Sequence, residues 1–446
     1  MKKLIKNTMA GVMAAAMLTS LAACGSSGSG SGSASTTSTG TAETSESAPI
    51  TGGTLKVTLS EEPGEGDALG NALDTWAAET GNTVEKIIIS HDDMRTKFPS
   101  MAKNKDLPDL CATTFLHQLY PDEFVDMSTV LDLSMFNENA LKLVGKSYTS
   151  DTITGVPEQY TTTCIFYNKD AFEAAGIEAP TIEDPWTWDE LYENAAILQE
   201  KAGVKYGFAA DVSRARYDIL MYANGGSIVE ADGDTFKVTL NSPQNVSTLE
   251  RFVQANNEVM PKAIWAGGTT DNPVEYFKNG DAAILLSGSW NYNTFSSEIT
   301  SFDFGVIPSP MGSTCQSAII GGSALAIPKD AENVELAEQF IQWLYGDDHS
   351  NYQDYLQLHK GLSVMNDVSY QPETDKAKED FAIMQNETNY VTDSFMTDEA
   401  SSWRTYKDAE YRDALERAVA GEVTAQEALD TFAAELAEAS GWEMAY

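Results

Sequence analysis

Alternating apolar and polar positions, rich in β-branched residues, recur from residue 54 onward and predict a series of β-strands. The predicted strands cover residues 54–59, 86–90, 107–112, 164–167, 282–287, 304–307 and 323–327. Segments whose apolar residues follow a helical period separate these strands. Because strands alternate with helices, the pattern predicts α/β domains with mainly parallel sheets.

Three helix starts can be predicted from local sequence. Thr187 and Glu190 have the spacing of a capping box, and the helix that they open is expected to run to about residue 199. Thr424 and Glu427 repeat that spacing, and Asn333 is expected to cap a third helix. The apolar faces are Val334, Ala337, Ile341 and Leu344 after Asn333, and Ala428, Leu429, Phe432, Ala433 and Leu436 after Thr424.

Residues 1–23 have the layout of a secretory signal peptide. Lysines precede a run of apolar and small residues, which is shorter than the roughly 20 residues that a membrane span needs. The run ends in Leu21-Ala22-Ala23-Cys24, which resembles the bacterial lipobox. This resemblance implies cleavage before Cys24 and a lipid on its sulfur. The alternative is an ordinary signal peptide followed by an incidental cysteine.

Residues 25–52 are nearly all Gly, Ser, Thr and Ala. Such a segment cannot bury enough apolar surface to fold, so we expect a disordered linker with an r.m.s. reach of roughly 30 Å. We therefore interpret residues 24–52 as a lipidated cysteine and a tether. They are expected to hold the rest of the chain at the extracellular face of a bacterial cytoplasmic membrane.

The charge and the cysteine content exclude several classes of partner and site. Acidic residues outnumber basic residues by 67 to 28, and the net charge of −39 disfavours nucleic acid and anionic headgroups. The four histidines are scattered, and no cysteine pair has the spacing of a zinc site, so no metal is expected. Cys111, Cys164 and Cys315 are expected to be buried free thiols.

No motif predicts catalysis. The glycine-rich loop that begins at Gly64 nearly matches a dinucleotide fingerprint, but its third glycine comes one residue late and its acidic residues would repel a pyrophosphate. The sequence contains no GxSxG nucleophile elbow. We therefore predict no catalytic residue and no cofactor. Paired carboxylates of a surface glycoside hydrolase stay open as the enzymatic alternative.

Five groups of residues, in order along the chain, resemble the extracellular solute-binding proteins of ABC importers. They lie at residues 155–160 with 166–176, at 185–191, at 224–227 with 240–243, at 277–290 with 304–308, and at 321–329 with 335–344 and 421–429. The second group reads Pro-Trp-Thr-Trp-Asp-Glu-Leu and is similar to that family's "P-x-T-W-D-E-L". The resemblance is to carbohydrate-binding family 1, which includes maltose-binding protein, and it spans about residues 54–436.

The resemblance implies a two-lobed periplasmic-binding-protein-like fold of type II, with discontinuous lobes joined by hinge strands. The N-terminal lobe is expected at residues 53–161 plus 290–365, and the C-terminal lobe at 162–289 plus 366–446. The chain is expected to cross between the lobes near residues 161–163, 321–323 and 363–368. Such lobes close on a ligand by hinge motion, and the closed form, expected to be a monomer, docks on the permease of an ABC importer.

A sugar site needs flat aromatic platforms and a few fixed polar groups. In the resemblance, Trp290 projects from a strand end into the cleft, although packing in the core is the alternative. Trp403 and Arg404 precede a C-terminal helix that often supplies a cleft aromatic, and a surface stack is their alternative. Trp186 and Trp188 are interpreted as structural because they belong to a helix-start motif.

Polar ligand contacts are expected at the ends of strands. The candidates are Glu61, Glu62, Thr113, Thr114, Glu158, Tyr160, Arg214, Gly322 and Ser323. Relatives often carry an aromatic residue near the position of Thr113 and Thr114, so the threonines suggest a smaller platform. If Arg214, Arg216 and Arg404 all faced the cleft, an acidic sugar would become plausible, since an arginine can grip a carboxylate.

The sequence thus predicts a non-enzymatic, lipid-anchored binding protein that delivers a carbohydrate to an ABC importer. A receptor of the same fold for another solute, such as a peptide or a polyol, is the first alternative. A surface glycosidase and a sensory protein that reports the ligand to a membrane receptor are the others.

Overall fold

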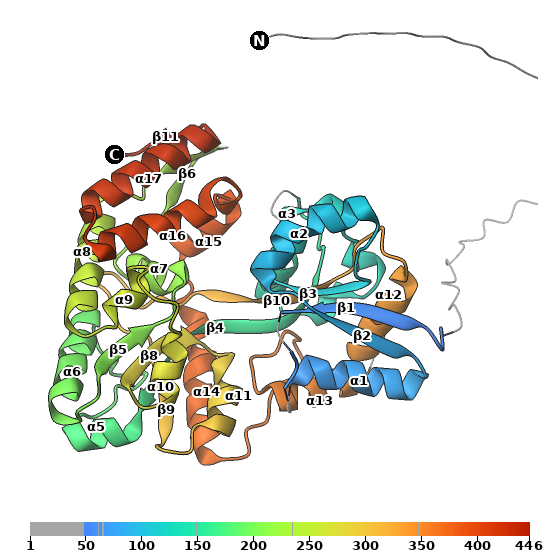
Figure 1. Ribbon diagram of the computed structural model, residues 1–446, viewed down its shortest axis with the longest axis horizontal. Helices are drawn as coiled ribbons and strands as arrows, with labels where there is room; N and C mark the ends of the chain where they lie inside the picture. The colour runs from blue at the N-terminus through green and yellow to red at the C-terminus, as the bar shows by residue number, and fades with distance from the viewer. Residues whose placement is uncertain (1–48, 61, 65–66, 148–149, 234, 347) are drawn as a thin grey trace, which may run out of the picture. The chain divides into compact units, whose positions relative to one another are not determined.

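The computed structural model describes residues 49–446 except 61, 65–66, 148–149, 234 and 347. By their contacts, Pro49–Tyr446 form one compact unit (Figure 1). The predicted signal peptide, Cys24, Glu61 and all but the last residues of the predicted tether lie outside the described residues.

Two sheets hold the strands. The strands are β1 (Thr54–Leu59), β2 (Thr83–Ile88), β3 (Leu110–Thr113), β4 (Val156–Asn168), β5 (Tyr206–Ala210), β6 (Val229–Asp232), β7 (Thr235–Val238), β8 (Ala282–Gly288), β9 (Phe304–Ile307), β10 (Ile320–Ala326) and β11 (Glu443–Met444). The larger sheet has eight strands in the order β2-β1-β3-β10-β4-β8-β5, with β9 also paired to β4. The smaller sheet has the order β11-β7-β6.

The larger sheet is mixed. β1 pairs in parallel with β2 and β3, and β5 pairs in parallel with β8. β10 is antiparallel to β3 and β4, and β4 is antiparallel to β8 and β9. The α/β fold is confirmed, but the expectation of mainly parallel sheets is wrong for the centre. The reason is that the chain leaves one lobe along β4 and returns along β10.

Helices surround the sheets in both lobes. They are α1 (Ala68–Thr80), α2 (His91–Asn104), α3 (Leu116–Leu119), α4 (Glu138–Ala140), α5 (Lys169–Ala175), α6 (Trp188–Lys201), α7 (Arg214–Ala223), α8 (Pro243–Glu258), α9 (Lys262–Trp265), α10 (Pro273–Lys278), α11 (Asn291–Glu298), α12 (Val334–Leu344), α13 (Ser350–His359), α14 (Asp375–Glu387), α15 (Asp393–Ser401), α16 (Arg404–Ala420) and α17 (Ala425–Ser440). There are also short 3-10 helices at Pro121–Glu123, Met127–Thr129, Leu133–Met135 and Thr388–Tyr390, and a π-helix at Leu141–Gly145. Among the described residues, no helix is both long enough and apolar enough to span a bilayer.

Local sequence determines how several of these helices start. Thr187 and Glu190 form the predicted capping box of α6, and Thr424 and Glu427 form that of α17. Asn333 precedes α12 as predicted, but its side chain makes no cap hydrogen bond. Its amide nitrogen donates instead to the carboxylate of Asp109, 3.1 Å away.

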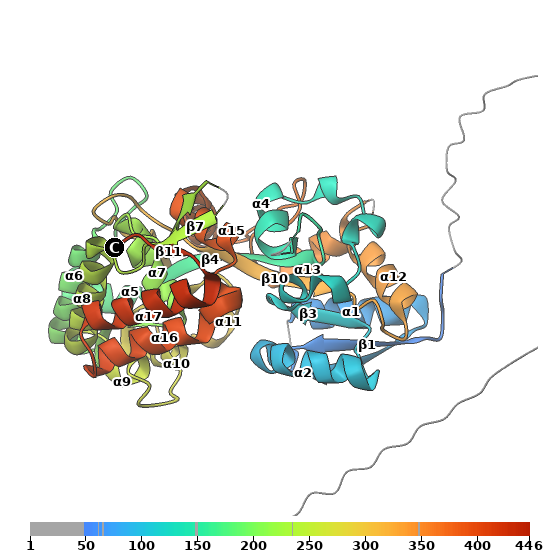
Figure 2. The ribbon, with the colours of Figure 1, turned by 90° about the horizontal axis from the view of Figure 1, so that it is seen from above.

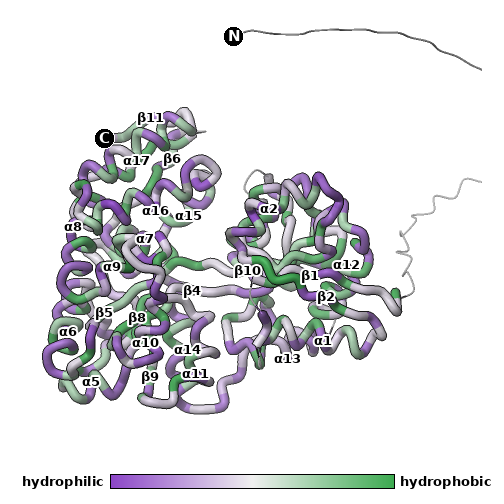
Figure 3. The backbone as a smooth tube through the Cα atoms, viewed as in Figure 1, coloured by the Kyte–Doolittle hydropathy of each residue, from purple (hydrophilic) through white to green (hydrophobic). Residues whose placement is uncertain are grey.

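Separate groups of buried side chains mark the two lobes. The N-terminal lobe packs β1, α1, α12 and α13 around residues such as Leu55 and Phe340. The C-terminal lobe packs α6, α7, α8, α16 and α17 around residues such as Phe208 and Leu429. Figure 3 shows the hydrophobic positions concentrated on strands such as β1 and β8, and a paler to hydrophilic colour on β4 between the lobes.

β4 and β10 are the hinge strands. On β4, Tyr160 packs in the core of the N-terminal lobe, whereas Cys164 and Ile165 pack in the C-terminal lobe. On the return, Ile319 packs against the C-terminal lobe and Ile320 packs in the N-terminal lobe. Figures 1 and 2 both show β4 and β10 running between the two groups of helices, and the strands pair from residue 156 to residue 162 of β4. Two discontinuous lobes joined by hinge strands are confirmed as the fold.

The lobe boundaries stay a prediction, and the packing supports a revised version of it. Tyr292, Phe295 and Phe304 lie between residues 290 and 319 and share a buried cluster with Phe166 and Phe277 of the C-terminal lobe. Residues 290–365 had been expected in the N-terminal lobe. We propose that residues 290–319 belong to the C-terminal lobe, with the second crossing near residue 319, close to the crossing expected near 321–323.

Three buried carboxylates attach the segment with α14 and α15 to the C-terminal lobe. Asp380 accepts a hydrogen bond from the backbone N–H of Val306, at 3.0 Å. Glu387 accepts from the backbone N–H of Ser309, also at 3.0 Å. Asp398 accepts from the backbone N–H groups of Ile228 and Val229 and from the Tyr222 hydroxyl. Backbone groups that strand pairing leaves without partners are thereby satisfied by side chains from the end of the chain.

Candidate ligand-binding site

Trp290 lies two residues after the end of β8 and directly before α11, and it is 44% exposed. Gly288 leaves room for its ring, because a Cβ at that position would lie 1.8 Å from the indole. The preceding residue, Ser289, exchanges hydrogen bonds with Thr162 of β4. The indole is therefore fixed beside the place where β4 crosses between the lobes.

Arg216 supports the indole from α7. Its guanidinium carbon lies 5.3 Å from the centroid of the Trp290 ring. Asp211 accepts from Nη2 of Arg216 at 3.1 Å, and the Ser287 hydroxyl donates to the same carboxylate oxygen. Asn291 in turn donates to the Ser287 hydroxyl at 2.7 Å. The chain of hydrogen bonds holds both the cation and the ring in one geometry.

The residues predicted on the hinge strands lie on neighbouring strands. Tyr160 of β4 is paired with Gly322 of β10, and Thr113 of β3 is paired with Ala324 of β10. Ser323 lies between these two pairs, at an irregularity in the register of β10 with β4. The structure thus brings β3, β10 and β4 together at one place, and ligand binding there stays a prediction.

Glu158 is buried at this irregularity and has no cation among the partners that the structure describes. Its carboxylate accepts hydrogen bonds from the hydroxyls of Tyr355 on α13 and Ser323 on β10. Burial raises the pKa of this carboxyl, and the hydroxyl donors oppose the shift. Glu158 therefore links β4 to β10 and α13 by hydrogen bonds, and its carboxylate has few acceptor positions left for a ligand.

The other polar candidates differ in their accessibility. Thr113 and Tyr160 are buried, and Thr114 is half-buried. Burial raises the pKa of Tyr160 to about 12, so its hydroxyl stays protonated and can donate a hydrogen bond. Glu62 is exposed in the loop after β1. Ligand binding by each of them stays a prediction.

Arg214 and Arg404 meet at one corner of the C-terminal lobe, between α15 and α16. Both pair with Glu399, Arg404 at 2.5 Å and Arg214 at 3.5 Å. Arg214 also pairs with Asp218, which is fully buried and accepts from the Tyr411 hydroxyl at 2.9 Å. Burial raises the pKa of Asp218, and the neighbouring arginines oppose that shift.

Trp403 lies inside this corner and is fully buried. Its ring packs edge-on against Tyr411 and Phe432, and the guanidinium of Arg214 covers it at 4.9 Å. No face of the indole is open to a sugar. Both of the earlier interpretations, a cleft platform and a surface stack, therefore give way to a supporting role for Trp403 beneath Arg214.

Residues 61–350 match the family of bacterial extracellular solute-binding proteins. The chain belongs to this family. An arabinooligosaccharide-binding protein of Bacillus subtilis is 25% identical over 260 residues, which are 57% of this chain and 55% of that protein. A sn-glycerol-3-phosphate-binding periplasmic protein of Shigella dysenteriae is 28% identical over 224 residues, 47% of this chain and 50% of the relative.

The chain thus spans about half the length of these curated relatives. An ABC substrate-binding protein of Listeria monocytogenes, solved in complex with cycloalternan, has the same fold. It is 19% identical, with a TM-score of 0.71 over 88% of this chain and 100% of that one. The two-lobed architecture of this solute-binding protein is therefore shared with solved proteins, while its own ligand has to be argued from its residues.

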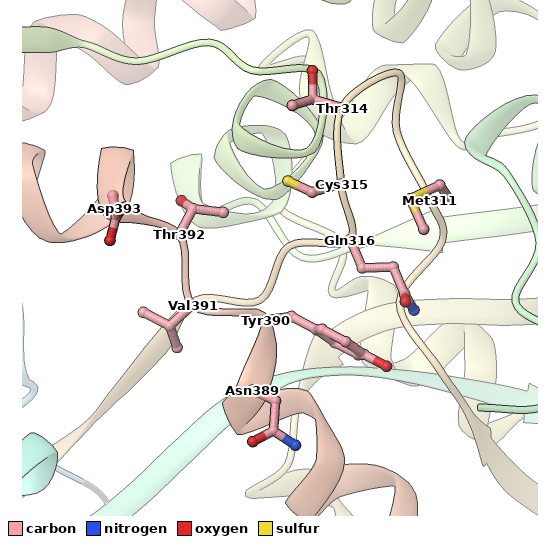
Figure 4. Close-up of a pocket in the computed structure, with 9 residues that line it drawn as sticks. All are labelled: Met311, Thr314, Cys315, Gln316, Asn389, Tyr390, Val391, Thr392 and Asp393. Carbon is pink, nitrogen blue, oxygen red and sulfur yellow. The ribbon is translucent and has the colours of Figure 1, made fainter. Parts of the chain in front are cut away.

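A cavity of about 560 Å³ lies outside the predicted site (Figure 4). Residues of the loop before β10, from Met311 to Gln316, line one side, and residues 389–393 line the other. Val391 packs against the cores of both lobes, so the cavity is close to the hinge. It contains none of the residues predicted to bind a ligand.

Phe115 is the clearest residue of the solute-binding protein that the sequence reasoning missed. It follows the two threonines after β3, where an aromatic residue was expected one or two positions earlier. Its ring lies 4.6 Å from the guanidinium carbon of Arg404. The sequence could have indicated Phe115, since this aromatic residue directly follows Thr113 and Thr114.

The free cysteines and the expected absence of metal can be compared with the described residues. Cys111 and Cys164 are buried free thiols as predicted, whereas Cys315 is only half-buried. Among the residues that the structure describes, no group of His, Cys, Asp and Glu has the arrangement of a metal site. Trp186 and Trp188 pack against the C-terminal core, which agrees with a structural role.

Proposed function

We propose that this solute-binding protein is a lipid-anchored extracellular receptor that captures a neutral carbohydrate between its two lobes and delivers it to the permease of an ABC transporter. The proposal combines the family, the hinge strands and the chemistry of the residues around the crossing. The half-exposed indole of Trp290 is the single observation that carries it, because a sugar presents a flat C–H face that stacks on such a ring.

The surroundings of Trp290 support a ligand with hydroxyl groups. Asn291, Ser287 and Asp211 form a line of hydrogen-bonded polar groups that ends on Arg216, whose guanidinium lies against the ring. A pocket that combines one aromatic platform with a few fixed polar groups suits the rim of hydroxyls around a sugar. A peptide would need in addition a charge clamp for its termini.

The charges support a neutral ligand over an acidic one. The three arginines that could have gripped a carboxylate are each paired with a carboxylate of the protein, so their formal charges cancel. The pairs are Arg214 with Asp218 and Glu399, Arg216 with Asp211, and Arg404 with Glu399. An anionic ligand would also meet Glu62 and the net charge of −39.

Cys24 and residues 25–52 would supply the anchor and the tether of this receptor, and the membrane permease would be its protein partner. We propose that it acts without catalysis, as a monomer, at the outer face of the cytoplasmic membrane. A glycoside hydrolase of this fold would require two carboxylates on either side of a bound glycosidic bond. Release of nitrophenol from aryl glycosides by the purified protein would contradict the proposal that the protein acts without catalysis.

Thermal unfolding with candidate ligands tests the proposal. The chain without residues 1–23, carrying Cys24→Ser to prevent lipidation, is unfolded in the presence of maltotriose, arabinotriose, glucuronic acid, glycerol 3-phosphate, ribitol and a tripeptide. A ligand at 100 times its dissociation constant adds about 2.7 kcal/mol to the free energy of unfolding. We expect stabilisation by a neutral saccharide.

Each other outcome changes the proposal in a defined way. Stabilisation by ribitol or by the tripeptide alone would keep the receptor and overturn the carbohydrate. Equal stabilisation by a neutral and an acidic sugar would overturn the argument from charge. Import and sensing share the same ligand site, so loss of sugar uptake after deletion of the gene is the result that supports import.

A further inference from the structure

A contact between residues outside β4 and β10 joins the two lobes. The ring of Phe115, between β3 and α3, belongs to the N-terminal lobe, since its neighbour Leu116 packs in that lobe with Phe98 and Phe124. Arg404 begins α16, and its neighbour Trp403 packs in the core of the C-terminal lobe. The guanidinium carbon of Arg404 lies 4.6 Å from the centroid of the Phe115 ring, within the range of a cation–π interaction.

The backbone is strained on both sides of this contact. Phe115 has a φ of +64°, and Ser402, two residues before Arg404, has a φ of +55°. Such values are rare for residues with a side chain, and for a bulky one such as phenylalanine they carry a cost in free energy. Strained positions persist where surrounding contacts hold them, and here they aim a ring and a cation at each other.

The guanidinium of Arg404 is fixed by an ion pair within the C-terminal lobe. Glu399 accepts from its Nη2 at 2.5 Å, and Arg214, which shares Glu399, is fixed by the buried Asp218. The side chain of Arg404 is only 15% exposed. A cation that is already paired and partly desolvated loses little hydration when a ring covers its face, so stacking is favoured.

We propose that Phe115 and Arg404 form a latch that favours the closed arrangement of the two lobes and slows the release of the ligand. The latch itself rests only on the two-lobed fold, whereas its effect on release rests on the proposed function. When the lobes separate, the ring and the cation part, and water replaces the stack. The pair of Phe115 and Arg404 therefore contributes to closure in addition to contacts with the ligand.

Small-angle X-ray scattering without ligand tests the latch in the chain that begins at residue 24 and carries Cys24→Ser. Phe115→Leu keeps the apolar bulk and removes the π face, and Phe115→Tyr keeps the face. Arg404→Lys keeps the charge and removes the planar stack. Arg412→Lys is the matched control, because the exposed Arg412 lies on the same helix and pairs with the half-buried Glu416.

We expect Phe115→Leu and Arg404→Lys each to shift the equilibrium between open and closed forms about 3- to 10-fold toward the open form, which raises the radius of gyration. The double variant should open no further than the single variants, because both remove the same contact. Phe115→Tyr and Arg412→Lys should match the original protein. Unchanged scattering in all variants would overturn the latch.

Binding kinetics of maltotriose and arabinotriose separate the latch from a direct ligand contact. We expect the rate of release to rise about 3- to 10-fold in the two opening variants. Weaker binding with unchanged scattering would overturn the latch and assign Phe115 to the ligand site. If neither sugar binds the original protein, the carbohydrate proposal loses its support, while the scattering of the free variants still decides the latch.

Discussion

The indole of Trp290 lies against the guanidinium of Arg216, whose carbon is 5.3 Å from the ring centroid. Asp211, which follows β5, accepts a hydrogen bond from this guanidinium. Ser289, which follows β8, accepts one from the backbone N–H of Thr162 on β4. The ring is thus fixed in position and yet 44% exposed. A large apolar surface that is held rigidly and left open is typical of a binding platform.

Replacing Trp290 by alanine should remove most of the affinity for the carbohydrate. We expect the dissociation constant to rise about 30-fold, because aromatic anchors contribute about 2 kcal/mol or more to binding. The free energy of unfolding should change by about 1 kcal/mol at most, since much of the ring is in contact with solvent. Isothermal titration calorimetry and urea unfolding give the two values.

Trp290→Phe should lose less affinity than Trp290→Ala, because it keeps a smaller platform. Tyr446→Ala is the matched control, since Tyr446 is also an exposed aromatic residue, at 62%, and lies far from Trp290 in the sequence. Equal affinities of Trp290→Ala and the original protein would remove the platform from the proposed site.

Asp211→Asn should change the charge preference of the site. Asparagine can still accept a hydrogen bond from Arg216, but it no longer cancels the cation. We expect binding of glucuronic acid to improve relative to glucose by about 3- to 10-fold at low salt, with the gain lost at high salt. Competition titrations at two ionic strengths measure this ratio. An unchanged ratio would mean that Arg216 does not face the ligand.

The stability of the C-terminal lobe should depend on pH through Glu387. Burial raises the pKa of this carboxyl from 4.5 to about 7. The folded protein therefore binds this proton more tightly than the unfolded chain does, so the stabilisation is present below about pH 4.5 and is lost as the pH rises through about 7. Asp398, whose pKa burial also raises to about 7, acts in the same direction.

Glu387→Gln should reduce the fall in unfolding free energy between pH 5 and pH 8 by about 1 to 3 kcal/mol. Glutamine can accept from the backbone N–H of Ser309 and donate to its hydroxyl, so the contacts are kept. Denaturation at several pH values measures the slope. Glu438→Gln, at an exposed position of α17, is the control. A slope that stays the same in Glu387→Gln would contradict the assignment.

The two neighbouring glycines of β10 should respond differently to alanine. A Cβ at Gly322 would lie 1.9 Å from the carbonyl oxygen of Gln159, whereas a Cβ at Gly321 would lie 3.9 Å from its neighbour, Oγ1 of Thr161. Gly322→Ala should therefore separate the hinge strands and cost more than about 2 kcal/mol of unfolding free energy. Gly321→Ala should change it by less than about 1 kcal/mol. Similar losses in both variants would exclude a close approach at Gly322.

Features of the fold that depend on neighbours in sequence could be predicted well. The strands at residues 54–59 and 304–307 and both capping boxes lie where the sequence placed them, since alternation and cap spacing are local. β2 begins at Thr83, three residues before the predicted start, and β5 was not predicted. Antiparallel pairing of β4 with β10 could not be predicted from either strand alone.

The candidate site shows the same limit. Trp290 could be proposed because its position after Gly288 and Ser289 places it at a strand end. The burial of Trp403 could not be foreseen, because Phe432, which encloses it together with Tyr411 of α16, comes from the next helix, α17. Likewise, the carboxylates that neutralise Arg214 and Arg404 include Glu399, which lies 185 residues after Arg214 and is brought beside it only by the fold.

The carboxylate of Asp398 completes the hydrogen bonding of Ile228, a residue 170 positions earlier in the chain. Glu387 and Asp380 do the same for Ser309 and Val306. A ribosome makes the chain from its N-terminus, so these acceptors emerge long after the donors that they satisfy. The C-terminal lobe therefore cannot finish its core until nearly the whole chain has been synthesised, and we expect these contacts between distant residues to slow its folding.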